Sequence, residues 1–269
     1  MSALLRSEYR KLVTTRLWWI LLLATAVYMA FLGAMLAFTL TITPQGAGAD
    51  SAPMDVTPET VRSSVYGVAA AFGYVFPVIV GVLSVTGEYR HNTITPTFLA
   101  EPDRLKVLLS KLVLGAGVGA LFGTVATLCT VGAGAAVLSI AGDPTLLGDM
   151  QTWALVGRSV LALTVWGVLG VALGALVTNQ VVAIVVVLVY TQFLEPIVRL
   201  LLAATGDLGS AIATYLPGAA GEAITGGSIY SEMGMGDLLP WAGGLVLLTA
   251  YALVLAAVGA ATSLRKDAG

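Results

Sequence analysis

Residues 87–111 read GEYRHNTITPTFLAEPDRLKVLLSK and form the longest polar run between two long apolar segments of this chain. The run contains the chain's only histidine, His91. It also carries seven charged side chains: Glu88, Arg90, Glu101, Asp103, Arg104, Lys106 and Lys111. Because the sequence on either side is apolar, we expect this segment to join two membrane helices and to make contacts outside the membrane.

The composition indicates an integral membrane protein. Of the 269 residues, 58% are hydrophobic and only 10% are charged, whereas soluble domains carry about 25% charged residues. The single cysteine, Cys129, excludes an internal disulfide and a metal site built from several cysteines. We interpret it as a small buried residue within an apolar run.

Segments without charged residues give the number of membrane spans. A helix needs about 20 apolar residues to cross about 30 Å of hydrocarbon. The polar tripeptide 178–180 divides a run that is too long for one helix. The sequence therefore predicts an all-α protein with one transmembrane domain over residues 1–269 and six spans, at 17–41, 64–86, 112–140, 159–177, 181–203 and 240–264. Residues 204–239 form a long outer loop and are candidates for short re-entrant helices.

The distribution of lysine and arginine predicts the orientation of the chain, since cytoplasmic segments are enriched in both. Six spans place the two termini on the same side. With the termini in the cytoplasm, ten of the thirteen basic residues are cytoplasmic and only Arg62, Arg158 and Arg199 are not. Residues 87–111 are then cytoplasmic as well.

Residues 1–16 have the pattern of a short amphipathic helix. Leu4, Leu5, Tyr9, Leu12 and Val13 share one face. The polar face includes the basic residues Arg6, Arg10 and Lys11. A basic amphipathic helix before a span lies along the inner membrane surface and contacts lipid head groups. A simple positively charged anchor is a compatible alternative.

Glycines recur at four-residue spacing in two of the predicted spans. Gly115, Gly119 and Gly123 lie in the third span, and Gly170 and Gly174 lie in the fourth. Small residues on one face allow helices to approach closely. The pattern fits packing within one chain or an interface with another subunit, and the sequence does not decide between them.

Glu195 and Arg199 are the charged residues of the fifth predicted span. Charged residues inside membranes are usually functional, so we consider them for the translocation path or an outer gate. The alternative is a pair that neutralises itself near the membrane surface, because Glu followed by Arg four residues later is a favourable helix pair.

The sequence lacks the motifs of several kinds of catalytic and binding site. The phosphate-binding loop G-x-x-x-x-G-K-[ST] is absent, so the chain does not hydrolyse ATP by that route. One histidine does not make a histidine-based zinc site. We predict no enzymatic activity, no metal site and no nucleic-acid partner.

Residues 87–111 resemble the segment after the second span in permease subunits of ABC-2-type exporters. The matching residues are Gly87, Glu88, Thr93, Phe98, Leu99, Pro102, Arg104 and Lys111. Asn92 departs from the pattern, since family members often have glycine before the threonine. The length, the span number and the basic N-terminus agree with the same family.

The resemblance implies a plasma-membrane permease that exports a hydrophobic or amphipathic compound. ATP and magnesium would bind to separate cytoplasmic ATPase subunits, and a second permease copy or paralogue would complete the path. Residues 87–111 would act as a cytoplasmic coupling helix, through Glu88, Arg90, Thr93, Pro102, Arg104 and Lys106. The alternatives are a membrane scaffold or sensor that binds a cytoplasmic partner, and an ion-coupled transporter that acts alone.

Overall fold

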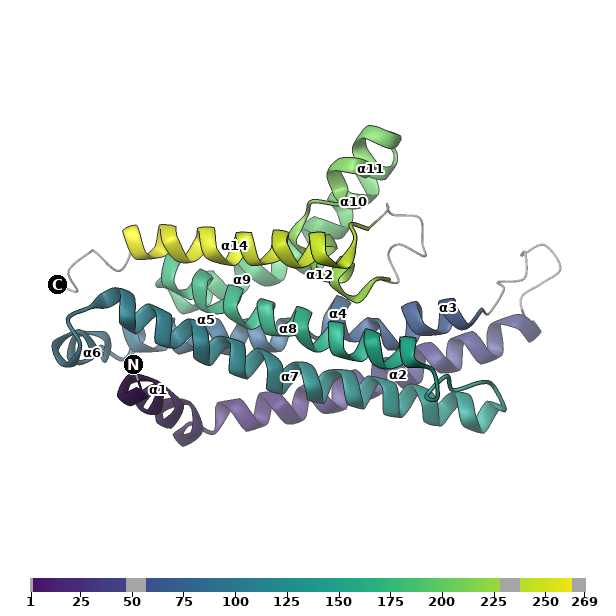
Figure 1. The fold of residues 1–269 in the computed structure, drawn as a ribbon, viewed down its shortest axis with the longest axis horizontal. Helices are drawn as coiled ribbons and strands as arrows, with labels where there is room; N and C mark the ends of the chain where they lie inside the picture. Colours follow the sequence, from purple (N-terminus) through teal and green to yellow (C-terminus); the bar gives the residue numbers. More distant parts are fainter. Residues whose placement is uncertain (1, 47–56, 228–237, 263–269) are drawn as a thin grey trace.

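The computed structural model describes residues 2–46, 57–227 and 238–262, and every regular element in them is a helix (Figure 1). The helices of the first half are α1 (Ser2–Thr14), α2 (Leu17–Gly46), α3 (Pro58–Val61), η1 (Arg62–Tyr66), α4 (Val68–Phe72), α5 (Val75–Arg90), α6 (Ile94–Ala100) and α7 (Arg104–Ala141). Those of the second half are α8 (Met150–Leu176), α9 (Gln180–Val189), η2 (Tyr190–Leu194), α10 (Glu195–Ala203), α11 (Asp207–Ala213), α12 (Pro217–Thr225) and α14 (Trp241–Ala261). The elements η1 and η2 are single π-helical turns.

Six helical segments are long and apolar enough to cross a membrane. They are Leu17–Thr41, Arg62–Arg90, Arg104–Ala141, Met150–Leu176, Gln180–Ala203 and Trp241–Ala261. The predicted fold class is therefore confirmed, including a helix before the first span and a short helix between the second and third.

Several helices extend beyond the ends expected from the charge-free segments. The helix of the third span begins at Arg104 rather than at residue 112, and that of the fourth begins at Met150 rather than at residue 159. A charged residue ends a hydrophobic run, but a helix continues until a cap replaces its backbone hydrogen bonds. Asp103 and Asp149 provide these caps, because their carboxylates accept hydrogen bonds from backbone N–H groups of the first turn.

The short helix between spans two and three is smaller than expected. The helix α6 holds only Ile94–Ala100, so the expectation of one short helix bearing Glu88, Arg90, Arg104 and Lys106 is wrong. Glu88 and Arg90 belong to the last turns of α5, and Arg104 and Lys106 belong to the first turn of α7. The connection reverses direction at Asn92, whose φ of 55° is left-handed.

The helix α8 lies at the centre of the bundle. It packs against α5, α7, α12 and α14. Two thirds of the residues in its most apolar stretch are buried, compared with about a fifth for α2. The stacked rings of Tyr74 and Trp166, with centroids 4.3 Å apart, lie in the same core. In Figure 1, α1, α6 and the last turn of α14 lie at one end of the bundle, which we call the α6 end.

The glycines predicted in spans three and four pack within the chain. An added Cβ at Gly119 would lie 2.6 Å from the carbonyl oxygen of Leu163 and 2.7 Å from the Cα of Thr164, both on α8. At Gly174 it would lie 2.8 Å from the carbonyl oxygen of Val82 on α5. These contacts support the intrachain interpretation, because backbone atoms occupy the space of the missing side chains.

We expect Gly119→Ala to lower the stability of the folded chain, because its methyl group meets backbone atoms that do not move independently. Overpacking of this kind costs about 1–3 kcal/mol, which corresponds to a fall of several degrees in the melting temperature in detergent. Gly117→Ala is the control, since an added Cβ there has no heavy atom within 4 Å. Equal melting temperatures for the two variants would contradict close packing of α7 against α8.

Candidate functional site

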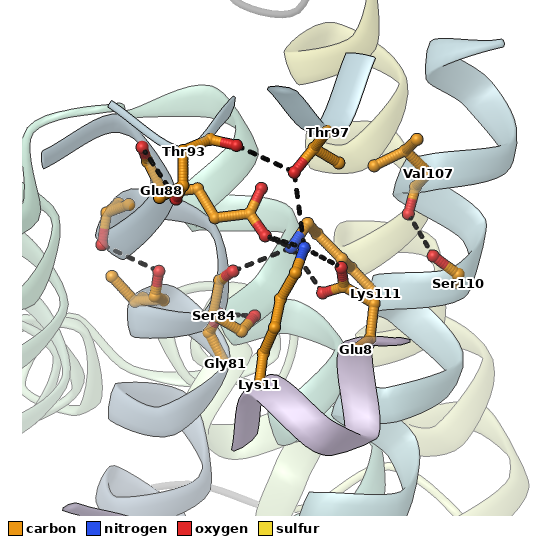
Figure 2. A network of polar contacts seen from close by, with 12 residues as sticks. Glu8, Lys11, Gly81, Ser84, Glu88, Thr93, Thr97, Val107, Ser110 and Lys111 are labelled. Atoms are coloured by element: carbon orange, nitrogen blue, oxygen red, sulfur yellow. Dashed lines mark hydrogen bonds and ion pairs between the residues drawn. The ribbon is translucent and has the colours of Figure 1, made fainter. Parts of the chain in front are cut away.

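Four charged side chains meet at the α6 end: Glu8, Lys11, Glu88 and Lys111 (Figure 2). We call them the four-charge cluster. The ammonium of Lys11 lies 2.6 Å from Glu8 Oε1 and 2.7 Å from Glu88 Oε1. The ammonium of Lys111 lies 2.6 Å from Glu8 Oε2 and 2.7 Å from the same oxygen of Glu88. Each lysine therefore bridges both glutamates.

The contacts of the cluster join the N-terminal helix α1 to three helices that follow one another later in the chain, α5, α6 and α7. Glu8 and Lys11 lie three residues apart on α1, which places them on one face of the helix. Glu88 lies in the last turn of α5, and Lys111 lies on α7. The ammonium of Lys11 also donates to the Thr97 hydroxyl of α6 at 3.4 Å. Movement of α1, α5 or α7 would stretch the ion pairs of the cluster, whereas α6 contributes only the Thr97 hydrogen bond.

Burial makes these ion pairs sensitive to the loss of a partner. Glu8, Glu88 and Lys111 are only 3%, 6% and 2% exposed. Two carboxylates and two ammonium groups balance the formal charge within the cluster. Removing one member of a buried pair is strongly destabilising, because the remaining charge stays buried without compensation.

Lys11 completes the cluster from the more exposed side. Burial of its ammonium lowers the pKa, but hydrogen bonds and charge attraction from Glu8 and Glu88 raise it by more, so that the pKa lies above its ordinary value of 10.5. Lys11 therefore carries its positive charge at neutral pH. Like Arg6 and Arg10, Lys11 is exposed, but its ammonium is directed to the two glutamates of the cluster.

The other residues predicted for coupling surround the cluster. Arg90 is exposed and donates to the Gln180 side chain at 3.3 Å, which links α5 to the first residue of α9. The Thr93 backbone N–H donates to the Glu88 carbonyl oxygen at 2.9 Å. Glu88 itself is buried, so it is not part of an exposed contact surface.

The remaining predicted coupling residues lie at the start of α7. Pro102 is exposed. The Arg104 guanidinium lies 5.1 Å from the centroid of the Phe98 ring, which joins α7 to α6. Lys106 pairs with Asp103 at 3.3 Å, and both side chains are about half exposed. These residues form the outer face of the α6 end.

Two members of the cluster were not identified as site residues from the sequence. Glu8 is the only acidic residue among residues 1–16, and this isolated acid within a basic helix was the available signal. In the sequence, Lys111 is only the charged residue that ends the polar run before the third predicted span. It lies within α7, two turns beyond the start at Arg104, and therefore faces α1 and α5.

Glu195 and Arg199 belong to a second buried network. The Arg199 guanidinium donates to Glu195 Oε1 and to Glu222 Oε2, both at 2.9 Å. The Glu195 carboxylate also accepts backbone N–H bonds from Gly218 and Ala219 at 3.0 Å. A carboxylate at the N-terminus of α12 is favourable because that end of a helix carries partial positive charge.

This network fixes part of the predicted outer loop against the fifth span. Glu195, Arg199 and Glu222 are 2%, 4% and 4% exposed. Glu222 was not predicted, because nothing in the sequence relates this residue of a loop to the fifth span. The structure places the segment after that span in two short helices, α11 and α12. Residues 228–237 lie outside the described residues.

Comparison with known proteins gives one family. A family model described as "ABC-2 family transporter protein" matches residues 4–193, about 70% of the chain. The match contains every member of the four-charge cluster and ends before the network at Glu195. No curated protein matches the chain.

We expect Lys111→Met to destabilise the folded chain by about 3–5 kcal/mol, since it leaves two buried carboxylates facing one ammonium. Thermal unfolding in detergent measures the change. Lys106→Met is the matched control and should have little effect, because its ion pair is exposed. Adding Glu88→Gln to Lys111→Met should restore part of the loss. Equal stability of the two single variants would show that the cluster does not hold the bundle together.

Proposed function

Because the chain belongs to the ABC-2 family of transporter proteins, we propose that it is the permease of an ATP-driven exporter and that separate ABC ATPase subunits hydrolyse the ATP. The family and the six membrane-spanning helices make the chain a multi-pass membrane permease subunit. The absence of a phosphate-binding loop from the sequence supports a division of labour between permease and ATPase. ATP and magnesium then bind to the partner subunits.

The proposed complex contains two permeases and two ATPases in the plasma membrane. Both termini and the α6 end face the cytoplasm in this arrangement, as favoured by the positive charge of residues 1–16. The second permease, either a copy or a paralogue, packs against the exposed apolar faces of this chain. One such face belongs to α2, where only 22% of the residues in the apolar stretch are buried.

The family match carries the permease assignment, and the four-charge cluster supports the proposed coupling. A push on α6 has to reach the membrane helices before it can open a transport path. The cluster connects α6 and α1 to the ends of α5 and α7, and these two helices continue into spans two and three. In this proposal the buried Glu88 does not contact the ATPase but transmits movement to the membrane helices.

The proposed ATPase contact is the outer face of the α6 end. It consists of α6 with Arg90, Thr93, Pro102, Arg104 and Lys106. Leu99 at the tip of α6 is 79% exposed. An exposed leucine among basic and polar residues is suited to insertion in a pocket of a partner, because burial of its side chain removes apolar surface from water.

The proposed cargo is a hydrophobic or amphipathic compound such as a drug, a lipid or a lipid-linked molecule. Within the described part of the membrane spans, charged side chains are few and those at Glu195 and Arg199 are already paired. We assign these two residues and Glu222 to an outer gate. Opening the gate would require separation of α10 from α12.

Co-expression with a candidate ABC ATPase subunit tests the proposal. We expect Leu99→Asp to weaken co-purification at least tenfold and to abolish permease-stimulated ATP hydrolysis, because a carboxylate would replace the apolar anchor. Ile140→Asp is the control, since Ile140 is 87% exposed in the last turn of α7 at the opposite end of the bundle.

Two results would contradict the proposed function. One is the absence of any complex or stimulated hydrolysis with the wild-type chain. The other is ATP-independent transport by the purified chain in liposomes. Equal loss in both aspartate variants would contradict only the assigned contact surface.

A further inference from the structure

A cavity of about 280 Å³ lies away from the α6 end, where α8 begins and α12 ends (Figure 1). It is bounded by the start of η1, by residues 151–158 of α8 and by the residues that end α12. Sites for drug-sized compounds have volumes of about 300–1,000 Å³. The cavity is therefore suited to one small polar group rather than to a complete amphipathic compound.

Two arginines from different helices line this cavity. Arg62 begins η1, and Arg158 lies on α8. They are two of the three basic residues that the sequence places outside the cytoplasm. No acidic side chain among the described residues lines the cavity. A cavity with this lining attracts an anion.

The two arginines differ in how their charges are compensated. Arg62 pairs with Asp149, the residue that caps α8. Arg158 forms no ion pair or hydrogen bond within the described part of the chain, and its guanidinium lies 5.4 Å from the centroid of the Trp241 ring. An aromatic ring attracts a cation but carries no net charge. One positive charge at the cavity is therefore left without a carboxylate from a described residue.

The Arg158 guanidinium is held at the cavity between Trp241 and the end of α12. Its Nη1 atom lies 3.3 Å from the position that a Cβ on Gly226 would take, and Gly226 caps the C-terminus of α12. This end of a helix carries partial negative charge, which stabilises a nearby cation without neutralising it. Arg158 is partly exposed and lines the cavity, so a ligand there can reach it.

We propose that this cavity binds a singly charged oxyanion, such as a phosphodiester or a carboxylate. Two oxygens of the anion accept hydrogen bonds from Arg158, because the planar guanidinium matches both groups. The Gln151 side chain lines the same cavity and offers further N–H donors. The oxyanion belongs either to a soluble anion or to the head group of an anionic lipid. Its binding requires no ATPase subunit.

Thermal unfolding of the full chain in detergent tests the site with dimethyl phosphate, a singly charged phosphodiester, at constant ionic strength. A ligand that binds only the folded chain raises the melting temperature. We expect Arg158→Gln to weaken the apparent affinity at least about tenfold, because a charge-assisted hydrogen bond is lost. Arg10→Gln is the matched control, since Arg10 is exposed on α1 and does not line the cavity. Equal stabilisation of both variants would overturn the proposal.

A carboxylate introduced at Ala154 provides a second test. Ala154 is exposed, lines the cavity and lies four residues before Arg158 on α8. Ala154→Glu should abolish the response to dimethyl phosphate at unchanged stability of the unliganded chain, because Glu followed by Arg four residues later is a favourable helix pair. Ala154→Gln has the same size without the charge and should keep most of the binding. Wild-type binding by Ala154→Glu would overturn the location.

Native mass spectrometry distinguishes the two sources of the anion. Phosphatidylglycerol and phosphatidylcholine with identical acyl chains are added in turn to the delipidated full chain. Preferential binding of phosphatidylglycerol that Arg158→Gln removes would identify a lipid head group. Binding of dimethyl phosphate without such a preference would identify a soluble anion. If neither probe binds in a way that depends on Arg158, the proposal is wrong.

Discussion

The balance of charge inside the four-charge cluster is the constraint on which the α6 end depends. An ammonium or a carboxylate that leaves water requires an oppositely charged partner, since the loss of hydration is otherwise uncompensated. Lys111 and Glu88 are buried on different helices, and Glu8 joins them from α1. The N-terminal helix is therefore part of the bundle and not only an attachment to the membrane. Through Thr97, the short helix α6 contributes one exposed hydrogen bond to the same cluster.

The second network applies the same physical principle at another place in the chain. Arg199 lies between two carboxylates, and one of these also caps α12. Between the two networks, the helices are held by the hydrophobic core and by close packing at glycines such as Gly119 on α7 and Gly174 on α8. Packing of this kind permits little sliding, because backbone atoms are in direct contact. Ion pairs can exchange partners, so we expect conformational change to begin at the charged networks.

For the proposed exporter, this arrangement separates contact with the ATPase from transmission of movement. Exposed residues such as Leu99 and Lys106 are available to a partner, whereas Glu88 is enclosed by two lysines.

The sequence by itself determined the class of protein and the number of spans. Low charge, long apolar segments and the pattern at residues 87–111 were sufficient, because the thickness of the bilayer sets the length of a helix. Only the tertiary structure decided which charges pair. Glu8 lies 103 positions from Lys111 in the sequence and Glu88 lies 23 positions from it, and no local spacing relates them. The same holds for Arg199 and Glu222, because an ion pair between distant segments depends on how helices pack after each has formed.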